Sequence, residues 1–365
     1  MRRTILLSTS IGIAVLLACV VSLLAALASS PAASAASAEH GASFAVRCDF
    51  SHRAQVDPIV SPGGTAAHMH DFLGNKTTKA SSTYDSMTAT GVTTTCSRPE
   101  DTAGYWIPTV SWQDQQGTHE LTPNRAVFYY RAGDKDYRTV QPFAKDLRII
   151  ADKGVNGARV RWYCGSGGSN DDKAGSPDPP TQCSGGVLGL RIIFPDCVAK
   201  GDLNDPNLSP VSSTSNYRAD DKITDPDPNT GQVKVIDPDT GQVVDIFDDD
   251  PNTPDHRLNM ARSKAQGDGT RACSDPSYPI PVPTLTINAN FPMPTTSGTV
   301  TLSSGDASTI HTDFWNTWDQ DKPLNLKTGD VDGYGGLKAL VKHCINEVPP
   351  TSPRPTECRA PTATA

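Results

Sequence analysis

The stretch Pro283–Phe291, "PTLTINANF", alternates apolar and polar side chains with a period of two residues. Successive side chains of an extended chain point to opposite faces, so Leu285, Ile287 and Phe291 would share one face. The intervening threonine and asparagine side chains would lie on the other face, next to solvent. The stretch therefore predicts a half-buried strand of an antiparallel sheet.

Other short β-like runs are separated by proline, glycine and aspartate turns: "AVFYYR" (126–131), "DLRIIAD" (146–152), "ARVRWYC" (158–164) and "LGLRIIFP" (188–195). Only residues 335–347, "GGLKALVKHCINE", carry the i, i+3, i+4, i+7 apolar stripe of a helix. With 30 prolines and 29 glycines in the chain, these patterns predict a mainly β fold. We expect an antiparallel sandwich or a distorted jelly roll, with long loops and a C-terminal helix.

The N-terminus combines Arg2 and Arg3 with an apolar run to about Ala28 and a small-residue segment rich in alanine and serine. This pattern predicts a signal peptide over residues 1–38 and a secreted protein with no membrane segment after cleavage. Two alternatives stay open. The apolar run is long enough for an uncleaved anchor on the outer face of the membrane, and Cys19 could carry a lipid.

Nine cysteines are present, and Cys19 lies inside the expected signal peptide. The other eight favour a fold stapled by up to four disulfides, because an even cysteine count is typical of exported chains. Their pairing stays open. No CxxC pair occurs, so a cysteine-based zinc site is not indicated.

The formal charge of −8 is concentrated between residues 220 and 255, where eleven aspartates and two lysines give −9. No basic cluster suited to nucleic acid is present. The repeat "DPNTGQV" and "DPDTGQV" indicates an Asp-rich hairpin inserted at about residues 217–254. A calcium loop is the alternative, but the spacing lacks the D-x-D-x-D-G pattern. Residues 348–365 form a Pro/Thr-rich tail.

Three polar segments are candidates for a functional site. In "SPGGTAAHMHDFLGN" (61–75), His68 and His70 would face the same side of an extended chain. "IHTDFWNTWDQD" (310–321) repeats this spacing with His311 and Asp313, and "PDHRLNM" (254–260) follows the acidic insertion. Imidazole, carboxylate, guanidinium and indole groups suit proton transfer, metal binding and stacking on a sugar face.

Five ordered segments give the chain a resemblance to the DUF1996 family, a domain of unknown function of bacterial and fungal extracellular proteins: "DPIVSPGGTAAHMHDFLGN", "TTTCSRPEDTAGYWIPTV", "GLRIIFPDC", "PDHRLNMA" and "HTDFWNTWD". The resemblance spans residues 44–347 as a single domain. It implies an extracellular setting and a carbohydrate context, without an established reaction.

Carried over by position, the family motifs fall on His68 and His70, on Asp255, His256 and Met260, and on His311, Asp313, Phe314, Asn316, Trp318 and Asp319. Two departures concern the approach to His256. Val198 stands where the family usually has tryptophan, and the Asp-rich insertion interrupts the usual passage to "PDH".

The first hypothesis is an extracellular enzyme, a hydrolase or lyase that acts on an extracellular or cell-wall polysaccharide or on another cell-wall polymer. Its candidate catalytic residues are His68, His70, His311, Asp313, Asp255 and His256, and its candidate substrate-binding residues are Trp315, Trp318, Asp319, Asn316 and Arg257. Convergence of His68, His70, His311 and Asp313 would also suit one divalent metal ion, such as zinc.

The alternative is a non-catalytic, wall-associated module that binds glycan or has a structural role. It predicts tryptophans on an open face, with the histidines acting as hydrogen-bonding struts. Trp106 is instead expected in the core, because large aromatic side chains on strands usually pack. No sequence pattern indicates a particular substrate or an oligomeric state.

Overall fold

The computed structural model describes residues 41–152, 159–165, 175–198, 260–261, 263–266, 270–274, 278–324 and 335–359, and the backbone of three short strands between residues 222 and 248. All of them belong to one structural unit, His40–Ala365. The segment expected to be a signal peptide, residues 1–38, lies outside the described residues.

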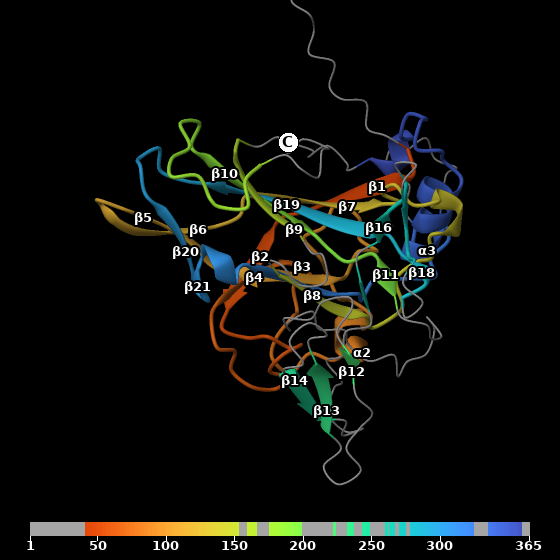
Figure 1. Ribbon diagram of the computed structural model, residues 1–365, viewed down its shortest axis with the longest axis horizontal. Helices are drawn as coiled ribbons and strands as arrows, with labels where there is room; N and C mark the ends of the chain where they lie inside the picture. Colours follow the sequence, from red (N-terminus) through yellow and green to blue (C-terminus); the bar gives the residue numbers. More distant parts are fainter. Residues whose placement is uncertain are drawn as a thin grey trace, which may run out of the picture. The chain divides into compact units, whose positions relative to one another are not determined.

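The first sheet has the alternating stretch Pro283–Phe291 at its centre. Its strands are antiparallel, in the spatial order β1 (Ser43–Cys48), β7 (Arg125–Arg131), β19 (Thr284–Pro292), β10 (Val187–Ile193) and β9 (Arg159–Cys164) (Figure 1).

Strand β19 is buried on both faces, which corrects the expectation of a half-buried strand. The polar side chains of Thr286, Asn288 and Asn290 are 0%, 8% and 4% exposed. Arg191 Nε donates a hydrogen bond to Asn288 Oδ1 at 2.9 Å, which pairs one of these buried groups. The polar half of the alternation is therefore buried and does not face solvent.

The second sheet carries the histidine motifs. Its strands are, in spatial order, β2 (Phe50–Ala54), β3 (His70–Gly74), β4 (Gly104–Pro108), β22 (His311–Trp315) and β8 (Arg148–Asp152). Neighbouring strands are again antiparallel. The central strand β4 pairs with β22, so the sheet joins segments about 200 residues apart in the sequence.

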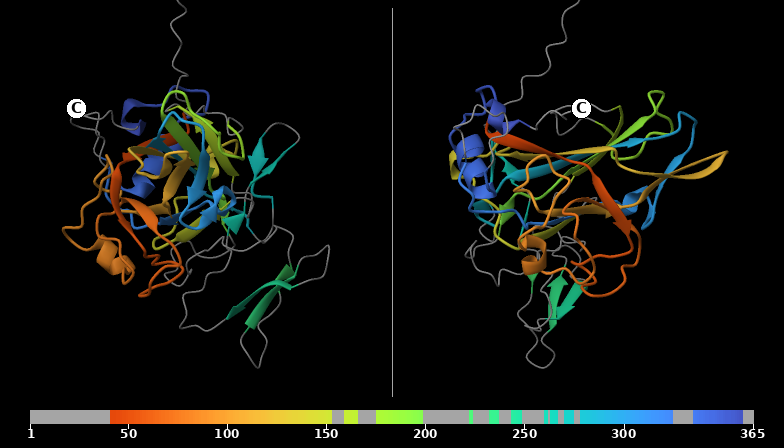
Figure 2. Two further views of the ribbon diagram at one scale, coloured as in Figure 1. Left: turned by 90° about the vertical axis from the view of Figure 1, so that its left-hand side faces the viewer. Right: turned by 180° about the vertical axis from the view of Figure 1, so that it is seen from behind.

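The two five-stranded sheets share one hydrophobic core. They lie one above the other in Figure 1, and Figure 2 shows the same ribbon from two further sides. Tyr105 of the second sheet packs against Phe128 of the first, with ring centroids 4.0 Å apart. The hydroxyls of Tyr105 and Tyr130 are hydrogen bonded at 2.6 Å across the same interface. The opposite face of the second sheet packs a smaller cluster that includes Phe72 and Trp106.

The structure also contains smaller sheets. A four-stranded sheet has the order β21 (Gly305–Asp306), β20 (Thr299–Leu302), β5 (Val110–Asp114) and β6 (Gly117–Leu121). Three shorter sheets consist of β15 (Met260–Ala261), β11 (Cys197–Val198) and β18 (Ile280–Pro281); of β12 (Lys222–Ile223), β13 (Gln232–Ile236) and β14 (Val243–Asp248); and of β16 (Lys264–Ala265) and β17 (Arg271–Ala272). The Val-rich runs of the Asp-rich segment pair antiparallel as β13 and β14.

Helical structure is short. The described helices are α2 (Tyr84–Thr88), α3 (Leu337–Leu340) with its π-helical continuation η3 (Val341–Asn346), and the 3₁₀ turns η1 (Tyr137–Thr139), η2 (Ala307–Thr309) and η4 (Thr356–Cys358). The C-terminal helix thus forms as the apolar stripe predicts, with a change to π geometry after its first turn. Within the described residues, no helix has the length and apolar character needed to cross a membrane.

Four disulfides join all eight cysteines of the expected mature chain: Cys48–Cys96, Cys164–Cys183, Cys197–Cys273 and Cys344–Cys358. The last one ties the C-terminal helix to the segment that follows it, where Arg354 and Cys358 are buried. The prediction of a mainly β, antiparallel and disulfide-stapled fold is confirmed.

Replacing Cys48 and Cys96 with serine should lower the free energy of unfolding by about 4 kcal/mol, because their bridge spans a sequence separation of 48. The matched comparison is replacement of Cys344 and Cys358, which are separated by 14 residues, with an expected loss of about 3 kcal/mol. Denaturant unfolding of the oxidised proteins measures both. A smaller loss for the first pair than for the second would contradict the chain-entropy argument.

Candidate metal centre

Two of the predicted histidines begin the strands on either side of β4 in the second sheet. His70 is the first residue of β3, and His311 is the first residue of β22. His70 pairs with Pro108 of β4, and the β4–β22 register, continued by two residues, places His311 opposite the same proline. Residues directly opposite in antiparallel strands share a face of the sheet, so both imidazoles lie on one side.

His68 completes the group from the segment that leads into β3. It precedes His70 by two residues, and the centroids of the two rings are 4.3 Å apart. The Nε2 atom of His311 lies 3.2 Å from Nε2 of His68 and 3.4 Å from Nε2 of His70. The structure therefore brings together the two histidine motifs that the sequence separates by more than 240 residues.

Backbone carbonyls orient two of the rings. Nδ1 of His70 lies 3.0 Å from the Val56 carbonyl oxygen, and Nδ1 of His311 lies 2.9 Å from the Thr309 carbonyl oxygen. A carbonyl oxygen only accepts hydrogen bonds, so each Nδ1 donates and carries the proton of the neutral ring. Each Nε2 then keeps its lone pair, and both lone pairs point into the space between the rings.

The protonation states agree with this arrangement. Burial lowers the pKa of His70 to about 2, and positive charge on His311 or His68 lowers this pKa as well. Burial lowers the pKa of His311 to about 4, and burial also lowers the pKa of His68. All three imidazoles are therefore neutral near pH 7, which is the form that binds metal ions.

The distances from His311 Nε2 to the Nε2 atoms of His68 and His70 match a tetrahedral metal site. A zinc ion binds histidine nitrogen at about 2.0–2.1 Å, so two nitrogen ligands of one tetrahedral ion lie about 3.3–3.4 Å apart. The measured separations of 3.2 and 3.4 Å are close to this value. Potential ligand atoms of His68, His70 and His311 all lie within 4.8 Å of one another. The donor set of three imidazoles fits zinc or a similar borderline ion.

Asp313 follows His311 by two residues in β22, so both side chains lie on the same face of the sheet. Its carboxylate is fully buried, and Oδ2 lies 3.8 Å from His311 Nε2. A carboxylate at this distance can orient an imidazole, accept a proton from a group bound beside it, or approach as a fourth ligand. Asp313 is thus the predicted carboxylate that the fold places beside the histidines.

The two tryptophans of the second motif are in the core. Trp315 and Trp318 are 0% and 1% exposed. The Trp315 indole donates to Asp146 Oδ1 at 2.6 Å, and the Trp318 indole donates to the Tyr130 hydroxyl at 3.0 Å. Because both rings are covered, they do not supply the open stacking face that a tryptophan-based glycan module requires. Trp106 is also buried, as expected.

The remaining predicted residues have different positions. Asn316 is buried, and its amide donates to the Ala144 carbonyl. Asp319 is exposed and lies beyond the far end of β22 from His311. Met260 is buried in β15, opposite Val198. Asp255, His256 and Arg257 lie outside the described residues.

Two backbone carbonyls, those of Val56 and Thr309, fix the histidine tautomers and are not predictable from residue types. A backbone carbonyl has no signature in the sequence. The turn that carries the Thr309 carbonyl, however, does have one. Asp306 caps the 3₁₀ turn η2 by accepting a hydrogen bond from the Ser308 amide at 2.7 Å. An aspartate immediately before a turn of small residues is a readable capping signal, and this turn ends at Thr309.

Comparison with known proteins supports the family and no more specific identity. The chain has no significant similarity to a curated protein or to a solved structure. The family model described as "Domain of unknown function (DUF1996)" matches residues 57–237, which include His68 and His70 and end before His311. The chain belongs to the DUF1996 family.

Proposed function

We propose that His68, His70 and His311 bind one divalent metal ion, with zinc the best fit. We further propose that the protein is an extracellular enzyme that uses this centre on a cell-wall polysaccharide. The observation that carries the proposal is the convergence of three Nε2 atoms at 3.2 and 3.4 Å, two of them with lone pairs aimed at each other. Facing lone pairs without a shared cation repel, so the arrangement favours a bound metal ion.

The residues have distinct roles in this proposal. The three imidazoles hold the ion, and the Val56 and Thr309 carbonyls keep His70 and His311 in the metal-binding tautomer. A bound ion supplies Lewis-acid chemistry when its fourth position stays open to solvent. His68 and His311 are both partly exposed, so substrate can reach their side of the cluster. The Asp313 carboxylate, with Oδ2 3.8 Å from His311 Nε2, would accept the proton in a hydrolysis or elimination step.

The setting and substrate rest on other observations. Four disulfides are consistent with an extracellular protein, because disulfides persist in oxidising compartments. The polysaccharide is suggested by the carbohydrate context of the family resemblance. The alternative of a structural ion in a non-catalytic module is favoured by the burial of Asp313, because a fourth protein ligand would close the site.

The test is metal content together with activity. The protein is dialysed extensively, analysed for metals, and incubated with cell-wall polysaccharides before and after chelation. We expect about one metal ion per chain, loss of this ion in the His68→Ala/His311→Ala variant, and chelator-sensitive release of reducing or unsaturated ends. His119→Ala is the matched control, because His119 lies on β6 outside the cluster.

Each result has a defined meaning. No bound metal in the wild-type protein, even after addition of zinc, would refute the centre. A bound metal without activity on any polymer, combined with unfolding on chelation, would favour the structural alternative over the enzyme.

A further inference from the structure

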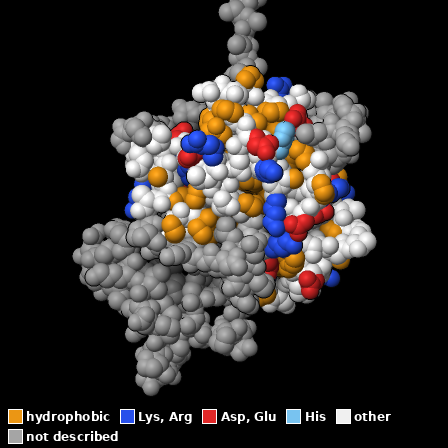
Figure 3. All heavy atoms as spheres, turned by 90° about the vertical axis from the view of Figure 1, so that its right-hand side faces the viewer, with side chains coloured by type: hydrophobic (Ala, Val, Ile, Leu, Met, Phe, Trp, Pro, Cys, Tyr) orange, Lys and Arg blue, Asp and Glu red, His pale blue; other side chains and the backbone are white. Residues whose placement is uncertain are grey.

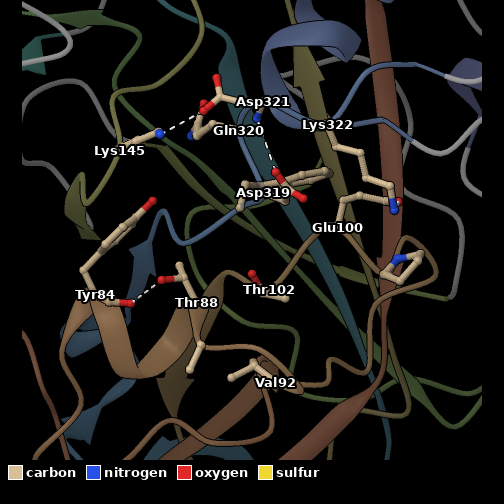
Figure 4. A pocket seen from close by; sticks show the side chains of 13 residues that line it. Tyr84, Thr88, Val92, Glu100, Thr102, Lys145, Asp319, Gln320, Asp321 and Lys322 are labelled. Atoms are coloured by element: carbon tan, nitrogen blue, oxygen red, sulfur yellow. Dashed lines mark hydrogen bonds and ion pairs between the residues drawn. The ribbon is translucent and has the colours of Figure 1, made fainter.

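A second candidate site lies in a cavity of about 390 Å³ between α2 and the segment that follows β22 (Figure 4). Its lining includes Tyr84, Glu100, Lys145, Trp318, Asp319 and Gln320. None of the three clustered histidines contributes to it. The volume is at the small end of the range of about 300–1,000 Å³ that is typical of small-molecule sites.

Two polar side chains of this cavity are buried with atoms that no described residue satisfies. Gln320 is 2% exposed, and neither its amide nitrogen nor its amide oxygen has a hydrogen-bond partner among the described residues. Glu100 is 3% exposed; Lys322 bonds its Oε1 atom, but Oε2 has no hydrogen-bond partner in the described structure. Buried polar atoms are normally paired, so these three atoms point to a ligand that supplies hydrogen bonds.

The charges around the cavity nearly balance. Lys322 pairs with Glu100, and Lys145 and Lys338 both pair with Asp321 at 2.9 Å. On the face of the molecule shown in Figure 3, acidic and basic side chains likewise lie close together. A strongly charged ligand would find no excess of the opposite sign here, so the cavity favours a neutral one.

The remaining chemistry suits hydroxyl groups. The Gln320 amide offers one donor group and one acceptor, while Glu100 Oε2 offers an acceptor. A hydroxyl both donates and accepts, so a ring of hydroxyls can satisfy all three atoms at once. Tyr84 lies across the cavity from Glu100 (Figure 4), is half-buried, and can pack its ring against the C–H face of a sugar.

We propose that this cavity binds one neutral sugar residue, as a second site separate from the histidine cluster. The cavity borders Trp318, three residues beyond the end of β22, whereas His311 begins that strand. The proposal goes beyond the metal centre and stands without it. The sugar can be a free monosaccharide or one unit of a polymer, because both present the same hydroxyls.

The test is ligand-observed NMR on the full chain with glucose, galactose, mannose and xylose, then with a disaccharide of each sugar that binds, and with glucuronate as a charged comparison. We expect a neutral sugar to bind, with Gln320→Leu weakening the affinity about tenfold or more. Gln115→Leu, at an exposed position on the β5–β6 turn, is the matched control and should bind like the wild type. A disaccharide that binds more tightly than its monosaccharide identifies a polymer unit as the ligand.

Folding does not confound this test. Gln320→Leu removes two unpartnered buried atoms and keeps a similar volume, so its melting temperature should be equal to or above that of the wild type. Absence of binding by every neutral sugar, or equal binding by Gln320→Leu, would overturn the proposal. Binding must also survive chelation and the His311→Ala substitution. Loss of binding under either condition would overturn the separate site, while loss of metal alone would count only against the proposed metal centre.

Discussion

Replacing His311 with alanine should weaken zinc binding about a hundredfold, because Nε2 of His311 lies within 3.4 Å of Nε2 of both other histidines. Structural zinc sites with four ligands bind with about 10–16 kcal/mol, so one ligand contributes on the order of 3 kcal/mol. Loss of one ligand then weakens zinc binding by about two orders of magnitude. Competition with a chromophoric chelator measures the dissociation constant of each protein.

The same substitution should remove most of the thermal stabilisation by zinc. At a zinc concentration of about 1,000 times its dissociation constant, the wild-type protein gains about 4 kcal/mol. A variant that binds a hundredfold more weakly gains only about 1.4 kcal/mol at that concentration. His119→Ala should behave like the wild type, since His119 lies outside the cluster. Equal zinc stabilisation of His311→Ala and wild type would contradict the three-histidine centre.

The Asp313→Asn variant distinguishes a catalytic metal centre from a structural one. The amide keeps the shape of the side chain but lowers its ability to accept a proton or to bind a cation. If Asp313 acts on a substrate beside an open ion, zinc affinity should change little while activity falls by about 10²–10⁴-fold. If Asp313 is the fourth ligand, zinc affinity should fall as it does in His311→Ala.

The strands were predictable from the sequence because side-chain alternation is a local property. The alternation in β19 gave the strand and its apolar face, but it could not show that Asn288 would meet Arg191 of β10 rather than solvent. Sequence periodicity reports a difference between two faces. It does not report what covers the polar face, since that depends on strands about 100 residues away.

The two histidine motifs were predictable from the sequence, but their convergence into one cluster was not. The i, i+2 spacing places His311 and Asp313 on one face of β22 through strand geometry. His68 lies in a bend before β3, so its contact with His70 depends on the path of that segment. Their meeting depends on β4, which pairs with β3 on one side and β22 on the other and aligns both strand starts at Pro108. Such strand registers are set by long-range packing, so they cannot be predicted from a single sequence.

Trp315 and Gln320 show why residue types can mislead. A tryptophan among polar residues resembles a sugar-binding motif, yet Trp315 fills the space beneath Arg148, which lies 4.1 Å from its ring centroid. A glutamine in the polar run "WDQD" looks like a surface residue, yet Gln320 is buried and borders a cavity. Burial, which decides both roles, is a property of the fold.

The histidines should also make the metal-free protein sensitive to acid. Burial lowers the pKa of His70 to about 2 and that of His311 to about 4, while an unfolded histidine titrates near 6.5. Above pH 6.5 both rings are neutral in the folded and the unfolded chain, so their ionisation costs no stability. As the pH falls below 6.5, the unfolded chain binds protons first, and stability falls until the folded-state pKa of each ring is reached.

At pH 4.5 this linkage amounts to about 3–5 kcal/mol for the two residues together. Buried carboxyl groups with raised pKa values, such as Asp71 and Asp101, act in the opposite direction, so the histidine effect must be isolated by comparison. In the presence of chelator, the His70→Gln/His311→Gln variant should lose less stability than the wild type between pH 7 and 4.5, by that amount. If the free energies of unfolding of the two proteins fall equally between pH 7 and 4.5, the fold does not hold either imidazole neutral. The proposal that the lone pairs of these imidazoles bind a metal ion would then lose its structural basis.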